Sequence, residues 1–181
     1  MLSGHTGPVA CVAVSEDHDT VVSASRGAAG VCLVHALRTG TFLRTVRADD
    51  GPIDHALLAA DGTLVTLAAA TGHLAVRTLN ARPLAALYVP KEADPAGSAA
   101  GAAAAREPPP LAVAAGAGLV ALTLDGRSVD VVRLHTLQPV CHMGAEDQVV
   151  ALAFAAGDTC VLAALANGAL RAYRVPPLGT P

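Results

Sequence analysis

The chain has 181 residues, a formal net charge of −3 and only 15% charged residues. Without a basic field to attract nucleic acid or anionic lipid, the composition speaks against nucleic-acid binding. An apolar content of 52% excludes intrinsic disorder for most of the chain. The longest apolar run, Leu111 to Leu124, is shorter than the roughly 20 residues of a spanning helix. We therefore expect no transmembrane segment and, since the N-terminus lacks signal-peptide features, a cytoplasmic protein.

Short apolar runs separated by turn residues occupy the first half of the chain. They alternate or are rich in β-branched residues, which predicts short antiparallel strands in a meander. The first unit consists of the run 9–14, Thr20 to Ser25, Val31 to His35 and Thr41 to Val46. The second consists of Ile53 to Ala60, Thr63 to Ala69, His73 to Leu79 and Pro83 to Val89.

The same pattern returns in the second half. A third unit contains Leu111 to Ala115, Leu119 to Leu124, Val129 to Leu134 and Pro139 to Met143, and a fourth contains Val149 to Phe154, Thr159 to Ala164 and Ala169 to Val175. Turns such as Asp61-Gly62 and Asn167-Gly168 are hairpin signals in which both residues are expected at positive φ. Units of about 40 residues are typical of β-propeller blades.

The predicted fold is therefore all-β, a partial propeller of about four four-stranded antiparallel blades. The expected organisation is blade 1 at 4–47, blade 2 at 48–90, an Ala/Pro-rich low-complexity loop at 91–110, blade 3 at 111–143 and blade 4 at 144–176. About 40 alanines oppose this on propensity alone, because alanine favours helices over strands. However, the Ala-rich runs outside the loop are of strand length and are broken by glycine, so they are too short for stable helices.

The first repeat resembles a WD repeat. Gly4-His5 precedes the first strand, Val21 to Ser25 form the second, and Val31 to Leu37 form the third. More narrowly, Gly4 to Val9 and Cys32 to Gly40 are similar to the C-terminal WD repeats of BEACH-domain proteins of the neurobeachin type, in which a histidine, here His35, replaces the usual tryptophan. Later segments, Val131 to Leu137 and Asn167 to Leu170, also fit the final blades of that family.

The chain departs from the full WD pattern in the hydrogen-bonded set that supports each blade. In a full WD repeat this set, the polar buttress, consists of the histidine of Gly-His, a serine or threonine on a strand, a turn aspartate and a tryptophan. His5 and Ser23 are available, but Arg26-Gly27 stands where the turn aspartate is expected. The Trp-Asp positions are occupied by other pairs in every unit: His35-Ala36, Arg77-Thr78, Val132-Arg133 and Tyr173-Arg174. We expect the blade architecture to persist with weakened support, and the chain to be a C-terminal part of a larger BEACH protein or the product of a truncated gene.

No residues stand out as catalytic, cofactor-binding or metal-binding. The seven histidines are spread over the units without the i, i+3 or i, i+4 spacing of helical ligands. Cys11, Cys32, Cys141 and Cys160 form no C-x-x-C pair and are expected to be small core residues. The cluster Glu16 to Asp19 lacks the glycine and final glutamate of a calcium loop, which favours a solvated hairpin turn.

The sequence thus favours a non-catalytic interaction scaffold with protein partners, since a propeller presents many loops on a rigid frame. The BEACH resemblance implies a role in vesicle trafficking and membrane-protein sorting, with peripheral association with endomembranes only through a larger parent protein. The alternatives are a truncated structural remnant and a generic WD-repeat adaptor without a trafficking role. The residues of the binding surface are not predicted.

Overall fold

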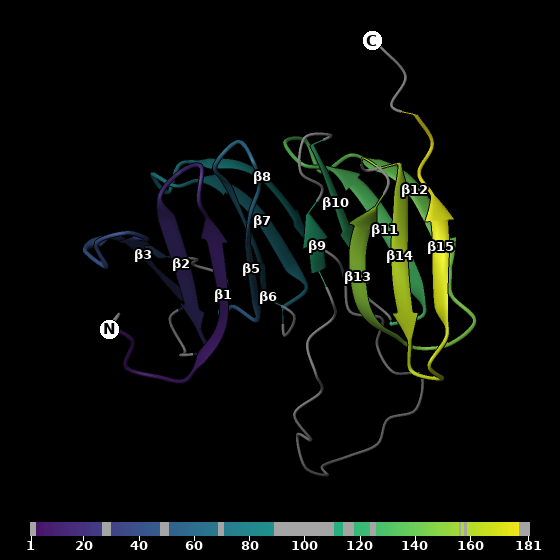
Figure 1. The fold of residues 1–181 in the computed structure, drawn as a ribbon, viewed down its shortest axis with the longest axis horizontal. Coiled ribbons are helices and arrows are strands. Elements are labelled where there is room, and N and C mark those ends of the chain that lie inside the picture. The colour runs from purple at the N-terminus through teal and green to yellow at the C-terminus, as the bar shows by residue number, and fades with distance from the viewer. Residues whose placement is uncertain are drawn as a thin grey trace.

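The structure is a computed structural model that describes residues 3–26, 30–47, 51–68, 71–88, 111–113, 118–123, 126–155, 157 and 159–177. In these ranges the chain forms antiparallel β-sheets in sequence order, and they contain no helix (Figure 1). Blade 1 contains β1 (Val9–Ser15), β2 (Thr20–Ser25), β3 (Val31–Ala36) and β4 (Phe42–Arg47). Blade 2 contains β5 (His55–Leu58), β6 (Thr63–Ala68), β7 (His73–Thr78) and β8 (Pro83–Tyr88).

The second half repeats this plan. Blade 3 contains β9 (Leu111–Val113), β10 (Leu119–Leu122), β11 (Ser128–Arg133) and β12 (Pro139–Gly144), and blade 4 contains β13 (Val149–Ala155), β14 (Cys160–Leu165) and β15 (Leu170–Arg174). The all-β prediction and its strands are confirmed, although the fourth sheet has three strands in the described part of the chain. The predicted loop at 91–110 lies outside the described residues.

The blades lie side by side in an arc (Figure 1). The first strand of each blade contacts the first strand of the next, so that β1, β5, β9 and β13 line the inside of the arc in that order. Each later strand of a blade pairs with the one before it, from the inside outward. Turns between the strands therefore gather on two rims, one at each end of the strands.

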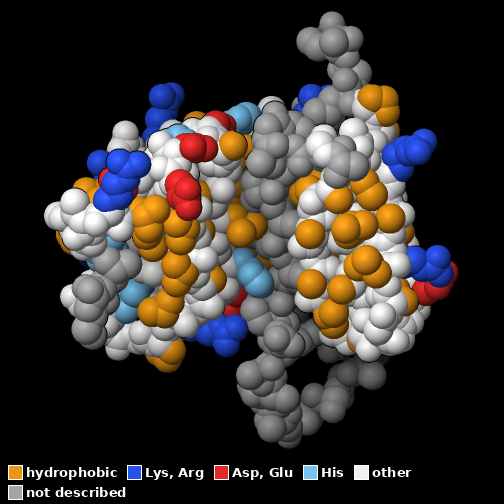
Figure 2. All heavy atoms as spheres, viewed as in Figure 1, with side chains coloured by type: hydrophobic (Ala, Val, Ile, Leu, Met, Phe, Trp, Pro, Cys, Tyr) orange, Lys and Arg blue, Asp and Glu red, His pale blue; other side chains and the backbone are white. Residues whose placement is uncertain are grey.

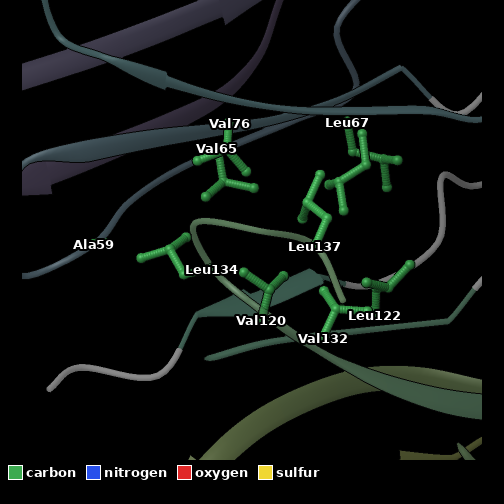
Figure 3. Packing of buried hydrophobic residues seen from close by; sticks show 10 residues of the cluster. Ala59, Val65, Leu67, Val76, Val120, Leu122, Val132, Leu134 and Leu137 are labelled. Carbon is green, nitrogen blue, oxygen red and sulfur yellow. The ribbon is translucent and has the colours of Figure 1, made fainter. Parts of the chain in front are cut away.

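Three hydrophobic clusters hold successive blades together, one at each interface. Between blades 2 and 3, Val65 and Leu67 of β6 meet Val120 and Leu122 of β10, all fully buried (Figure 3). A second strand such as β6 is buried on both faces, because a neighbouring blade covers each of them. The core of the molecule thus lies between the sheets, and the stability of each blade depends on its neighbours.

Alanine is abundant because the interfaces between blades use it. Ala24, Ala121 and Ala163 lie on second strands and have no exposed surface. Ala24 belongs to the cluster between blades 1 and 2, and the other two belong to the cluster between blades 3 and 4. Burial in close-packed sheet interfaces therefore overrides the weak strand propensity of alanine.

The hairpin turns differ in one respect from the sequence prediction. At Asp61-Gly62 only the glycine has positive φ, 80°, and the same holds at Asn167-Gly168, where Gly168 has φ 85°. Gly62 N–H donates to the Ala59 carbonyl oxygen at 3.0 Å, and Ala59 N–H to that of Thr63 at 2.8 Å. This is a three-residue loop, a type I turn that ends in a left-handed residue. The expectation of two positive φ angles is wrong here because the loop has one residue more than a two-residue hairpin.

These two turns provide a matched test of local strain. Gly62→Ala and Gly168→Ala each place an alanine at positive φ, and each is expected to lose about 1 to 2 kcal/mol of unfolding free energy. The new Cβ at Gly62 would lie 2.9 Å from His18 Nε2, whereas nothing lies within 4 Å at Gly168, but His18 is exposed and its ring can move aside. Urea denaturation should therefore give similar losses for the two variants. A clearly larger loss for Gly62→Ala that His18→Ala removes would contradict this.

Candidate interaction surfaces

The histidine and serine of the WD pattern meet in blade 1. His5 Nε2 and Ser23 Oγ share a hydrogen bond at 2.8 Å, which ties the segment before β1 to β2. Gly4 lies directly against Leu33 of β3, so closely that a Cβ at this position would be 2.9 Å from Leu33 Cδ1. The expected structural role of His5 is confirmed.

The position of the usual tryptophan in blade 1 holds a buried histidine. His35 is 2% exposed, and its ring meets the ring of Phe42 edge-on with centroids 5.6 Å apart. Its Nδ1 is buried without a hydrogen-bond partner. His35 therefore fills the space of the larger aromatic residue by packing against Phe42, but it does not supply the same polar support.

The other Trp-Asp positions lie at the ends of third strands and serve different contacts. Val132 of β11 belongs to the hydrophobic cluster between blades 2 and 3. Tyr173 of β15 donates its hydroxyl to the Gly144 carbonyl oxygen at 3.1 Å, which joins blade 4 to the end of blade 3. Arg26, which stands in place of the turn aspartate, pairs with Asp54 of the next blade at 3.3 Å. At Val132, Tyr173 and Arg26, contacts between blades thus stand where the full WD pattern has hydrogen bonds within a blade.

One rim carries the turns β1–β2, β3–β4, β5–β6, β7–β8 and β11–β12, and we call it the first rim. Polar contacts link neighbouring blades along it. Asp61 Oδ2 lies 3.1 Å from His135 Nε2, between blades 2 and 3, and Arg44 of blade 1 donates a hydrogen bond to Asn80 of blade 2. Polar contacts therefore link the turns of blades 1, 2 and 3 along the first rim.

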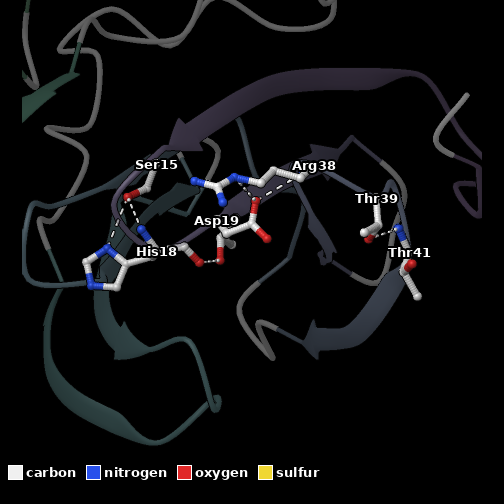
Figure 4. Close-up of polar contacts among 7 residues, drawn as sticks. Ser15, His18, Asp19, Arg38, Thr39 and Thr41 are labelled. Carbon is white, nitrogen blue, oxygen red and sulfur yellow. Dashed lines mark hydrogen bonds and ion pairs between the residues drawn. The ribbon is translucent and has the colours of Figure 1, made fainter.

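The acidic cluster Glu16 to Asp19 forms the β1–β2 turn of this rim, as predicted (Figure 4). Asp19 Oδ1 accepts a hydrogen bond from the Arg38 backbone N–H at 3.0 Å, and His18 Nδ1 and Ser15 Oγ lie 3.0 Å apart. In the described part of the chain no three His, Cys, Asp or Glu side chains are grouped so that they could hold a metal ion. The turn thus presents charge to solvent, fixed by its own side-chain contacts.

Asp61 has a pKa below its ordinary value of 3.8. Burial acts to raise the pKa, but hydrogen bonds from Thr63 and the charge of His135 lower it by more. A carboxyl group with a lowered pKa in the folded state stabilises the fold above the unfolded pKa, and this stability is lost as the pH falls through the folded pKa.

Asp61→Asn is therefore expected to flatten the acid limb of the stability curve. Asparagine keeps the oxygen that accepts from Thr63 N–H at 2.9 Å, but it loses the charge that faces His135. The melting temperature, measured from about pH 6 down to pH 2, should fall less steeply in the variant than in the unsubstituted chain. Asp17→Asn, in the exposed β1–β2 turn, is the control. Parallel curves of melting temperature against pH for Asp61→Asn and the unsubstituted chain would refute the stabilising role of the Asp61 charge.

The cysteines occupy two kinds of environment. Burial raises the pKa of Cys32 to about 12, and it also raises those of Cys11 and Cys141, which pack against the hydrophobic clusters. These three fit the predicted core role. Cys160 differs, because it is half-buried at the start of β14 and belongs to none of the clusters.

Two apolar surfaces remain exposed at the ends of the arc. The outer face of blade 1 is the face turned away from blade 2, and there Val9, Val12 and Val14 of β1 are 51%, 57% and 53% exposed. The outer face of blade 4 is the face turned away from blade 3, and it carries Ala151, Ala153, Leu162, Ala164, Leu170 and Ala172. Figure 2 shows hydrophobic side chains gathered over β1 and over β13 to β15. The sequence did not single out these faces, because only the order of packing shows which blade faces lack a neighbour.

Within the described ranges, no helical segment is long and apolar enough to cross a bilayer.

Comparison with known proteins yields no matching family model. The chain is 36% identical over 101 residues to cilia- and flagella-associated protein 251 of Chlamydomonas reinhardtii, a match that covers 53% of this chain and 12% of that protein. Among solved structures it is similar to the computationally designed proteins Ika4 (TM-score 0.72, 20% identity, 97% of this chain and 96% of that chain) and Ika8 (0.71, 19%, 96% and 48%).

It is also similar to the WD40 repeats of RRP9, with a TM-score of 0.67 and 16% identity over 96% of this chain and 53% of that chain. The chain thus spans about half the length of two of these solved structures. At such low identity the likeness concerns the fold alone. Together with four successive antiparallel sheets, it shows that the chain has a WD40-like β-propeller fold.

Proposed function

We propose that this chain is part of a BEACH-type WD-repeat scaffold that binds protein partners in vesicle trafficking and membrane-protein sorting. The observation that carries the proposal is the arrangement in blade 1. The Gly4-His5 segment is bonded to Ser23, and His35 is buried at the tryptophan position. That histidine is the feature through which the sequence resembles the C-terminal repeats of BEACH proteins.

Binding is proposed at the first rim. Its turns are held by contacts between blades, so little conformational entropy is lost when a partner binds. Glu16 and Asp17 project from the β1–β2 turn, and the side chain of Arg38 is 81% exposed beside them. A rigid rim with charges of both signs suits a polar protein surface or peptide, and charge complementarity would set its specificity.

Proximity labelling in cells tests this proposal. The chain, fused to a biotin ligase, is expected to label proteins of transport vesicles and their membranes. Glu16→Lys with Asp17→Lys should abolish that labelling, while Arg47→Glu at the far end of β4 serves as a charge-reversal control that retains it. A labelled set without trafficking proteins, or one that the rim variant leaves unchanged, would refute the proposal.

A second candidate is a scaffold of cilia or flagella. It is supported by the 36% identity over 101 residues to cilia- and flagella-associated protein 251. The same fusion expressed in ciliated cells separates the two candidates. Label concentrated in the cilium would favour this candidate and would contradict the trafficking role, whereas label confined to vesicle membranes would contradict the ciliary one.

A further inference from the structure

The outer face of blade 4 is one half of an interface that the chain already forms three times. By strand register, Leu162 and Ala164 of β14 occupy the positions of Val22 and Ala24 in β2, since their β13 partners Ala153 and Ala151 match Ala13 and Cys11. Val22 and Ala24 have no exposed surface, because blade 2 covers them. In β14 burial alternates along the strand, and Leu162 and Ala164 stay half-exposed. A neighbouring blade is what this face lacks.

The outer face of blade 1 is the other half of the same interface. Val12 and Val14 pair with Ser23 and Val21, as Leu152 and Phe154 of blade 4 pair with Ala163 and Val161. In blade 4 the corresponding face, which carries Leu152 and Phe154, packs against blade 3. In blade 1 both valines are more than half exposed, whereas Ser23 and Val21 of β2 are already buried, Ser23 in its hydrogen bond with His5. The arc therefore ends in two apolar faces, and on blade 1 the exposed part of the face is β1.

Both faces turn toward the same side of the molecule, since one view shows the hydrophobic side chains of each (Figure 2). One partner can therefore cover both. We propose that this partner is a second copy of the chain, with blade 4 of each copy packed against blade 1 of the other about a two-fold axis. Each contact would repeat the interface between successive blades, and the two contacts together would close a ring.

The lengths of two of the three similar solved structures agree with a ring of this size, whereas Ika4 is as long as one copy, since 96% of it aligns with this chain. The chain aligns with 48% of the designed protein Ika8 and with 53% of the RRP9 WD40 repeats, so two copies contain about as much polypeptide as either. Closure would also cover Val9, Val12 and Val14, each of which is more than half exposed. The inference concerns the end faces of the 181-residue chain and does not depend on the proposed partners of the first rim, whereas in a longer WD-repeat scaffold further blades would cover the same two faces.

The mass of the purified chain in solution is the first test. Light scattering during gel filtration is expected to give about twice the 18.0 kDa of one chain, falling toward one chain on dilution. Cys160, beside the outer face of blade 4, should react faster with a thiol reagent when the protein is diluted. A single-chain mass across the whole concentration range, with Cys160 reacting equally fast at each concentration, would overturn the proposal.

Two substitutions test the geometry. Leu162→Asp and Val14→Asp each place a charge on one end face, and each should raise the dissociation constant by at least about tenfold. A mixture of the two variants should associate more tightly than either alone, because it keeps one unaltered interface. Leu84→Asp, at a 41% exposed position on β8, is the matched control and should remain dimeric.

Which of the two substitutions dissociates the dimer shows which blades pack against each other. If Leu162→Asp dissociates the dimer while Val14→Asp does not, blade 4 packs against blade 4, and the proposed pairing is wrong. The same holds if the mixture associates no better than the single variants. Circular dichroism confirms that each variant is folded, and Val14→Asp is the safer variant because its side chain is 53% exposed.

Discussion

Leu67→Ala is expected to destabilise the protein by about 2 to 5 kcal/mol. Leu67 lies on β6 with no exposed surface, in the cluster that joins blades 2 and 3 (Figure 3). The substitution removes its contacts with both blades, and the surrounding sheets cannot collapse fully into the space. Because this cluster holds blades 2 and 3 together, the substitution should lower both the cooperativity and the urea midpoint of unfolding.

Urea denaturation followed by circular dichroism measures both effects. Leu84→Ala removes the same atoms from β8 of the same blade, at a position 41% exposed, and should cost under about 1 kcal/mol. Similar losses in the two variants would mean that the cluster between blades 2 and 3 does not hold them together.

Ala121→Leu is expected to destabilise the protein by about 1 to 3 kcal/mol, although it adds apolar surface. Ala121 lies on β10 with no exposed surface, facing blade 4 beside Val161 and Ala163. A larger side chain has no space there unless blades 3 and 4 move apart. The effect would show that alanine sets the distance between the sheets at this interface.

The control is Ala86→Leu, on the outer strand β8, where the side chain is exposed. It should change the melting temperature little, and leucine and alanine differ only modestly in strand propensity. If Ala121→Leu were neutral or stabilising, the interface would have room to spare and the abundance of alanine would need another cause.

Most of the fold was predictable because strands and turns leave local signals. Alternating runs such as Val31 to His35 and turn pairs such as Asn167-Gly168 mark each strand and its end. The turn type was less accessible. Whether Asp61-Gly62 closes a two-residue or a three-residue loop depends on which residues pair across the hairpin, and that register is set by packing on both faces of the sheet.

The candidate surfaces were predictable only in part. The sequence indicated that Glu16 to Asp19 form a polar turn and that His5 and Ser23 share a structural role, and both predictions are confirmed. It did not indicate that Arg26 pairs with Asp54, because this ion pair joins different blades. It also assigned Cys160 to the core along with the other cysteines, since an apolar strand looks the same whether or not a neighbour covers it.

The sequence by itself determined the class of the fold and the order of its strands, because these depend on local patterns of apolar and turn residues. Only the tertiary structure decided which face of each strand is buried. Val22 and Leu162 stand at the same position of their blades, yet blade 2 covers the first, and no blade of this chain covers the second. Whether a strand face is buried depends on the neighbouring sheet, and the residue pattern of the strand does not reveal whether such a sheet is present.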